Sequence, residues 1–149
     1  MKKNQLALTA LSLLISAFAL NFSKPDQPTV GYVQIEGQKS GRLKGNPGSP
    51  EWDINIISFN YTEEDKAHHI TASVKFSKPV DETSQGIQNC FNQNQNLSDV
   101  KCTLFNMQGK KQIVYEIVKL TNAFIKQIDQ NAPNETITLQ FQKIETNYN

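Results

Sequence analysis

Residues 29–61 read TVGYVQIEGQKSGRLKGNPGSPEWDINIISFNY, and this stretch decides the fold class. A predicted strand ends at Ile35, Glu36 and Gly37, and a loop rich in lysine and glycine follows it. A second strand opens with Glu-Trp-Asp-Ile at residues 51–54. The stretch therefore predicts two β-strands joined by a long loop.

The second strand changes the phase of its apolar residues. Ile54 and Ile56 share one phase, whereas Ile57, Phe59 and Tyr61 share the other. A slip of one residue turns every later side chain to the opposite face of a sheet. We therefore expect either a bulge near residues 56–57 or a strand that is covered on both faces. Both hold if a barrel wall also packs against a neighbouring subunit.

The rest of the chain also has a period of two. Apolar and polar residues alternate over 70–77, 100–104 and 137–142, as in strands with one buried face. One helix is expected from Ser84 to about Asn92, with Thr83 or Ser84 as its cap and an apolar stripe of Ile87, Cys90 and Phe91. About seven strands and one helix favour a mainly β chain, an antiparallel barrel or sandwich.

The N-terminal 23 residues have the pattern of an export leader. Lys2 and Lys3 precede an apolar run over 6–20, and Ala17-Phe18-Ala19 forms a small-x-small cleavage site. We expect a signal peptide cut after Ala19, and a protein cut there is secreted, to the periplasm or to the extracellular medium. An uncleaved anchor and a mis-assigned start are the alternatives. Residues 24–28 then form a proline-containing linker and residues 29–146 a single domain.

The composition argues against a role that depends on charge. Of the 149 residues 19% are charged, and the formal net charge is +1. Proteins that bind nucleic acid carry a strong positive field, so no nucleic-acid partner is expected.

Cys90 and Cys102 are the two cysteines of the chain. In an exported protein they can form a disulfide that closes a loop of about 13 residues. Two buried free thiols are the equal alternative, because cysteine packs as a small hydrophobic residue. Their spacing matches no zinc-binding pattern.

No catalytic, metal or cofactor site is predicted. His68 and His69 are adjacent, so on a strand they point to opposite faces and cannot share a metal ion. The acidic run at residues 63–65 is interpreted as a solvated turn. The glycines at 37, 41, 45 and 48 lack the pattern of a phosphate-binding loop and lead into a strand. We interpret them as part of a flexible basic surface loop with Lys39, Arg42 and Lys44, and we do not expect an enzyme.

Five pieces of the sequence, in order, resemble the Hcp family of type VI secretion. They are IEG at 35–37, EWDI at 51–54, KPVD at 78–81 with Ser84, the run 115–125, and the closing strand 135–144. The resemblance implies a compact, two-sheet antiparallel β-barrel with one lateral helix, which assembles into hexameric rings and stacked tubes. It implies that the partners are copies of the chain itself, the spike protein and small effectors, and that no cofactor is bound. The loop over 37–50 is the implied stacking element.

Two functions of different classes follow. The first is a ring subunit of a type VI apparatus, or a secreted paralogue of one, since an export leader does not suit loading from the cytoplasm. The second is an exported monomeric β-sandwich that binds a ligand in the periplasm or at the cell surface.

Overall fold

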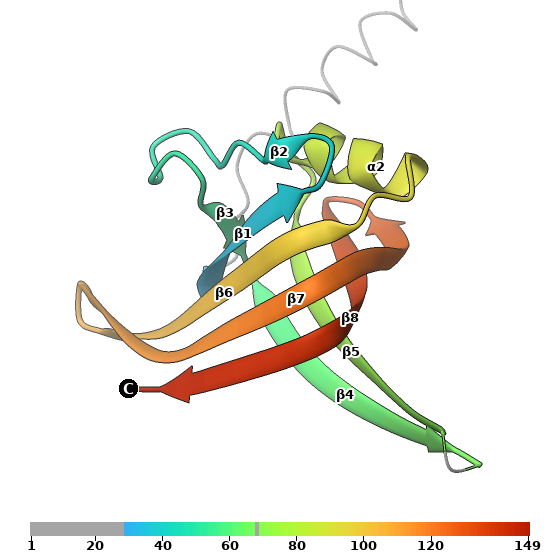
Figure 1. Cartoon of the computed structure of the whole chain (residues 1–149). Helices are drawn as coiled ribbons and strands as arrows, with labels where there is room; N and C mark the ends of the chain where they lie inside the picture. The colour runs from blue at the N-terminus through green and yellow to red at the C-terminus, as the bar shows by residue number, and fades with distance from the viewer. Residues whose placement is uncertain (1–28, 68) are drawn as a thin grey trace, which may run out of the picture.

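Eight antiparallel strands and one helix form the part of the chain that the computed structural model describes, residues 29–67 and 69–149 (Figure 1). The strands are β1 (Gly31–Gly37), β2 (Gly41–Arg42), β3 (Ile54–Ile56), β4 (Ser58–Lys66), β5 (His69–Pro79), β6 (Leu97–Gln108), β7 (Lys111–Asn131) and β8 (Asn134–Tyr148). The helix is α2 (Ser84–Asn92). The expectation of a mainly β chain with one helix is confirmed for these residues.

The strands form one curled sheet rather than two separate sheets. Their order is β2-β1-β6-β7-β8-β5-β4, and β3 pairs with β1 beside β2. Only Ile57 separates β3 from β4, so this segment pairs with β1 at one end and with β5 at the other. The described strands thus curl into a barrel-like wall, although no ladder joins β4 to β1.

The predicted change of phase lies at Ile57, but as a break between two strands and not as a bulge. Before it, Ile54 and Ile56 pair with β1 and are fully buried. After it, Phe59 pairs with the buried Phe76 of β5 and packs against the core. Paired residues of neighbouring strands point to the same face. Phe59 of the second phase therefore faces the same core as Ile54 and Ile56 of the first.

The core follows the register of the sheet. Val33, Cys102 and Val118 are paired across β1, β6 and β7, and all three are buried. Val74 and Leu139 are paired across β5 and β8 in the same way. The period-two pattern of the sequence therefore gives the correct buried face over these strands.

Helix α2 has the bounds that the sequence predicts. Ile87 and Cys90 are buried against the barrel, and Phe91 is half-buried. Thr83 is the residue at the N-cap, but its side chain makes no capping hydrogen bond. Its hydroxyl donates to Asp81 instead. Within the described residues there is no helix with the length and apolarity to span a membrane.

Candidate functional site

The end of the barrel that carries α2, β2 and the loop over residues 38–53 is called the helix end (Figure 1). The sequence predicts one flexible loop over residues 37–50, whereas the structure has a hairpin followed by a turn in this region. Its first part is a hairpin, since β2 pairs with the end of β1. Arg42 lies in β2 and makes an exposed ion pair with Glu36 at 3.1 Å. Lys39 and Lys44 are exposed on the same loop.

The hairpin rests on Gln95, a residue that follows α2 and is almost fully buried. The Gln95 Oε1 atom accepts hydrogen bonds from the backbone nitrogens of Lys39 and Ser40, at 3.3 and 3.2 Å, and from Ser40 Oγ at 3.1 Å. A Cβ atom at Gly37 would lie 2.6 Å from this oxygen. The glycine is therefore needed for close packing, a role that the sequence did not reveal.

The second part of the loop is a turn over residues 46–53. It is closed by backbone hydrogen bonds from Gly45 to Glu51, at 2.8 Å, and from Asn46 to Asp53, at 3.0 Å. Gly45 is buried, and a Cβ atom there would lie 2.4 Å from the carbonyl oxygen of Asp53. Backbone atoms cannot move aside as a flexible side chain can, so this turn requires glycine at position 45.

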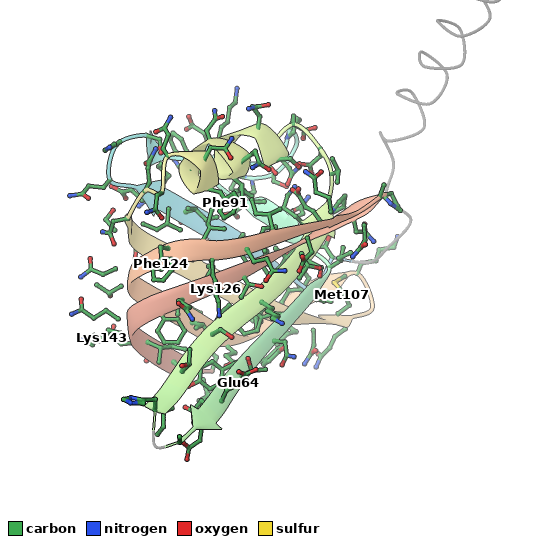
Figure 2. All side chains as sticks on the ribbon, turned by 90° about the vertical axis from the view of Figure 1, so that its right-hand side faces the viewer. Glu64, Phe91, Met107, Phe124, Lys126 and Lys143 are labelled. Carbon is green, nitrogen blue, oxygen red and sulfur yellow. The ribbon has the colours of Figure 1, made fainter. Side chains whose placement is uncertain are left out.

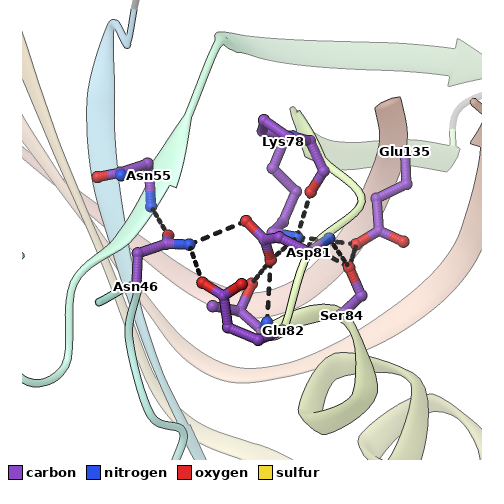
Figure 3. Close-up of polar contacts among 9 residues, drawn as sticks. Asn46, Asn55, Lys78, Asp81, Glu82, Ser84 and Glu135 are labelled. Atoms are coloured by element: carbon purple, nitrogen blue, oxygen red, sulfur yellow. Dashed lines mark hydrogen bonds and ion pairs between the residues drawn. The ribbon is translucent and has the colours of Figure 1, made fainter. Parts of the chain in front are cut away.

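A buried ion cluster lies beneath the turn, at the start of α2 (Figure 3). Lys78 is fully buried, and its Nζ atom lies 2.9 Å from Asp81 Oδ1 and 3.0 Å from Glu135 Oε1. It also donates to the carbonyl oxygen of Pro79 at 2.6 Å and to Ser84 Oγ at 3.0 Å. Glu135 is 2% exposed and accepts a further hydrogen bond from Ser84 Oγ at 2.6 Å. Buried charges occur in proteins when they are paired and hydrogen-bonded, as these are, because these contacts offset the cost of removing the charges from water.

Asp81 is the partly exposed member of the cluster. Burial alone would raise its pKa, but the hydrogen bond from Thr83, the charge of Lys78, and the hydrogen bonds from Asn46 and Lys78 outweigh that effect and hold the pKa below its ordinary value. In the part of the chain that the structure describes, no buried side-chain nitrogen or oxygen lacks a partner. The helix end is therefore a fully satisfied polar assembly.

The sequence interpretation missed this cluster, although a signal was present. Lys78 has the same phase as Val74 and Phe76, and Glu135 has the same phase as Ile137 and Leu139. A charged residue on the buried phase of each of two strands predicts a buried pair. Only the register of β5 with β8, which pairs Lys78 with Glu135, brings the two together.

The opposite end of the sheet, called the open end, carries the tips of the β4–β5 and β6–β7 hairpins and the end of β8 (Figure 1). On its core-facing side there is a hollow of about 220 Å³ between β4, β7 and β8. Its lining is mostly apolar and consists of Phe59, Tyr61, Glu116, Val118, Ile144, Thr146 and Tyr148. Tyr148 is 76% exposed and Tyr61 39% exposed. Within the described residues, β8 pairs with β5 only through residues 134–140, so β4 and the end of β8 diverge around the hollow.

A smaller hollow of about 90 Å³ lies on the other face of the sheet, over β4, β5, β7 and β8. Its lining is polar and comprises Thr62, Glu64, Thr71, Ser73, Lys75, Lys126, Gln127, Thr138 and Gln140. Figure 2 labels Glu64 near the tip of β4 and Lys126 on β7. The two faces of this part of the sheet therefore differ sharply in polarity.

The remaining predicted positions lie apart from both ends or outside the described residues. His69 is exposed at the start of β5, while His68 and the leader with Ala17 and Ala19 lie outside the described residues. The acidic run at 63–65 belongs to β4 and not to a turn, because β4 continues to Lys66. Glu63 accepts a hydrogen bond from the hydroxyl of Tyr61. Over residues 29–67 and 69–149, no three histidine, cysteine or acidic side chains are grouped as a metal site would need.

The two cysteines are free and buried in the structure, so the possible disulfide is not formed. Cys90 Sγ lies 3.4 Å from a Cβ atom built on Gly37, whereas Cys102 is paired with Val33. Gly37 and Val33 are four residues apart on β1, so their Cα atoms are about 13 Å apart. Cys90 and Cys102 therefore contact β1 at two well-separated positions. A disulfide needs Cα atoms within about 7 Å. Burial raises the pKa of the Cys102 thiol to about 12.

Comparisons with known proteins agree with this architecture. A sequence model of the family described as type VI secretion system effector, Hcp, matches residues 32–148. No curated protein matches the chain in sequence. Among solved structures, the secreted protein Hcp3 from Pseudomonas aeruginosa has a TM-score of 0.70 and 18% identity, over 81% of this chain and 91% of that one. Hcp1 of the E. coli EAEC 042 pathovar, solved as a mutant, has a TM-score of 0.68 and 16% identity, over 81% and 90%. A type VI secretion system effector from Yersinia pestis has a TM-score of 0.64 and 18% identity, over 79% and 88%.

Proposed function

Because the chain belongs to the Hcp family of type VI secretion, we propose that it is a structural subunit that self-associates into hexameric rings. The rings stack into a tube of a type VI apparatus, and the chain is a subunit of that tube or a secreted paralogue of such a subunit. The observation that carries the proposal is the family match, which spans residues 32–148 and so takes in every strand of the curled sheet except the first residue of β1.

A subunit of this kind acts through its surfaces and needs no reaction of its own. The open end supports the proposal, because its hollow combines exposed Tyr61 and Tyr148 with half-buried Phe59 and Ile144. Exposed apolar groups that gather in one place are typical of contact surfaces. A second copy of the chain is the occupant that the ring requires, and a head-to-tail contact that closes on itself gives a ring.

The helix end supplies the stacking surface in this proposal. Lys39, Arg42 and Lys44 are exposed on a loop that is held in place from below. Leu43 lies among them and is buried, so a deletion of this segment would also disturb the core. Charge reversal at Lys39 and Lys44 is the cleaner change, with Lys143→Glu on β8 as the control. We expect shorter tubes and intact single rings from the first variant and no change from the control.

The other partners, which the proposal includes, are the spike protein and small effectors carried in the lumen. Secretion is part of the proposal as well, and the leader over residues 1–23 is proposed to be cut after Ala19. The mass of protein collected from culture supernatant tests the cleavage, since an intact Met1 would contradict it.

The oligomeric state of residues 24–149 tests the function itself. Size-exclusion chromatography with light scattering should give about six times the mass of one subunit, as a closed hexamer requires. A protein that stays monomeric at high micromolar concentration would overturn the ring and leave the exported ligand-binding module as the better function.

A further inference from the structure

One side chain, that of Asn46, joins the 46–53 turn to the buried ion cluster (Figure 3). Its Nδ2 atom donates to Asp81 Oδ2 at 2.9 Å and to Glu82 Oε1 at 3.0 Å. Its Oδ1 atom accepts a hydrogen bond from the backbone nitrogen of Asn55, in β3, at 2.8 Å. The turn, a strand of the barrel and the segment before α2 are therefore connected through one amide group.

Apolar burial does little to position the turn itself. In the segment from Leu43 to Ile54, Gly45 is the only buried residue between these two, and it has no side chain. Pro47, Gly48 and Pro50 are exposed, and Trp52 is half-buried but is not among the residues that pack against the core cluster. The orientation of the turn on the barrel thus depends on polar contacts, which are directional where apolar contacts are not.

Asp81, the acceptor for Asn46, is itself held firmly. Lys78 approaches one of its oxygens at 2.9 Å, and the backbone nitrogen and hydroxyl of Thr83 donate to the same oxygen at 2.9 and 2.7 Å. Lys78 on β5 is the charged group in contact with the aspartate, whereas Glu135 on β8 pairs with Lys78 and Glu82 accepts from the same amide of Asn46. Its second oxygen accepts from Asn46, so the turn is attached to an atom that moves only with the barrel.

We propose that Asn46 and Asp81 are positioning residues, which fix the 46–53 turn on the helix end in the orientation that contact with a stacked neighbour requires. The part about stacking rests on the proposed function, whereas the contact and its effect on the turn do not. The charge of Asp81 strengthens the contact, because hydrogen bonds to a charged acceptor are stronger than those to a neutral one.

Asn46→Asp is the variant that tests the contact through its charge. At neutral pH the new carboxylate would face Asp81 and Glu82, and like charges at this distance repel. We expect backbone hydrogen exchange at residues 46, 53 and 55 to become about tenfold faster than in the unaltered protein, since a directional contact to a charged group is lost. The ratio should shrink as the pH is lowered from 7 towards 5, because the like charges raise the pKa of the new carboxyl and protonation relieves the repulsion.

Two further variants serve as comparisons in the full chain. Asn46→Ala should speed exchange at the same three amides with a ratio that does not depend on pH over this range. Ser49→Ala removes a hydrogen bond between the turn and β3, from Ser49 Oγ to Asn55 Oδ1 at 3.3 Å, and leaves the contacts of Asn46 with the cluster in place. It should leave exchange at residues 46 and 53 unchanged. The barrel amides of Val33 and Leu120 should be unaffected in all three variants.

Equal exchange in Asn46→Asp and the unaltered protein would overturn the proposal, as would a uniform acceleration that includes Val33 and Leu120. So would a ratio that is independent of pH in Asn46→Asp. Electron microscopy then separates the two levels of the argument. If the turn loosens in Asn46→Asp while its tubes are as long as those of the unaltered protein, the stacking role is wrong. If the unaltered protein forms no rings at all, the proposed function fails while the positioning of the turn stands.

Discussion

The helix end and the open end of the barrel are stabilised in opposite ways. At the helix end, the fully buried Lys78 and the almost fully buried Glu135 lie inside a network in which, among the described residues, every buried side-chain nitrogen and oxygen has a partner. At the open end, Tyr148 and Tyr61 leave much of their aromatic surface exposed around a hollow. Polar networks fix one geometry, because hydrogen bonds depend on angle and distance. Exposed apolar surface fixes no geometry by itself and gains free energy when a partner covers it. The difference indicates that the helix end has a fixed shape, whereas the open end has an apolar surface that a partner can cover.

The largest effect is expected from Lys78→Met, which removes the cation from the buried cluster. Glu135 would then be buried without a counter-charge, and loss of one partner of a buried pair costs about 3–5 kcal/mol of the free energy of unfolding. Urea denaturation would measure the loss. The matched control is Lys143→Met, because Lys143 and Glu145 form an ion pair at 2.7 Å that is exposed at both side chains. If both substitutions cost the same, the contrast between buried and exposed ion pairs is wrong.

Gly45→Ala should cause the second-largest loss of stability, because it alters the 46–53 turn of the helix end directly. The added Cβ atom would lie 2.4 Å from the Asp53 carbonyl oxygen, so the backbone must shift. Overpacking of this kind costs about 1–3 kcal/mol. Thermal unfolding gives the loss of stability, and hydrogen exchange at residues 45 and 53 should show that the turn has moved. An unchanged melting temperature would mean that the turn is not rigid.

Gly86→Ala, also at the helix end, should increase the free energy of unfolding, whereas Gly45→Ala should lower it. Gly86 lies inside α2, and an added Cβ atom would make ordinary contacts, the nearest at 3.5 Å from Leu43. Alanine is favoured over glycine in a helix by about 0.5–1 kcal/mol, so the variant should be more stable than the unaltered protein. Denaturation in urea tests the sign. A destabilised variant would show that α2 packs more tightly against the loop than the structure indicates.

Tyr148→Ser should separate stability from association at the open end. Because Tyr148 is 76% exposed, its removal should leave the free energy of unfolding of the single subunit nearly unchanged. Association should weaken, which light scattering over a concentration series would detect. Tyr115→Ser is the control, since Tyr115 lies next to Glu116 on β7 and points to the opposite face. An equal loss of association in both variants would contradict the role of the hollow.

The last prediction concerns the unaltered protein and is tested by a count of its free thiols. The denatured protein should contain two free thiols, because Cys90 and Cys102 are not bridged. The folded protein should react slowly at Cys102, since its pKa is raised to about 12 by burial and only the thiolate is nucleophilic. A count below two in the denatured protein would contradict the free thiols and support the disulfide.

Local patterns were enough for much of the fold. The period of two placed the strands, and the apolar stripe of Ile87 and Cys90 placed α2 at its observed bounds. The phase change near residue 57 was also correct, but its interpretation was wrong. A sequence shows that two phases are apolar, and it does not show that the chain changes strand partner between them, which puts Phe59 on the same core as Ile54 and Ile56.

The candidate site was less accessible from the sequence. Lys39, Arg42 and Lys44 could be placed on a surface loop, because their composition and the surrounding glycines are typical of one. The division of that loop into a hairpin and a turn could not be predicted. It depends on Gln95 and on the cluster of Lys78, whose partners are distant in the chain.

By itself, the sequence determined the longer strands with a period of two, helix α2 and the resemblance that names the family, because each depends on the order of residues along a few turns or strands. The tertiary structure alone decided which side chains of distant segments meet. The register of β5 with β8 joins Lys78 to Glu135, and the curl of the sheet brings Tyr61 and Tyr148 to one hollow. The physical reason is that hydrogen-bonded and ionic contacts act over a few ångströms in space, and separation along the chain carries almost no information about that distance.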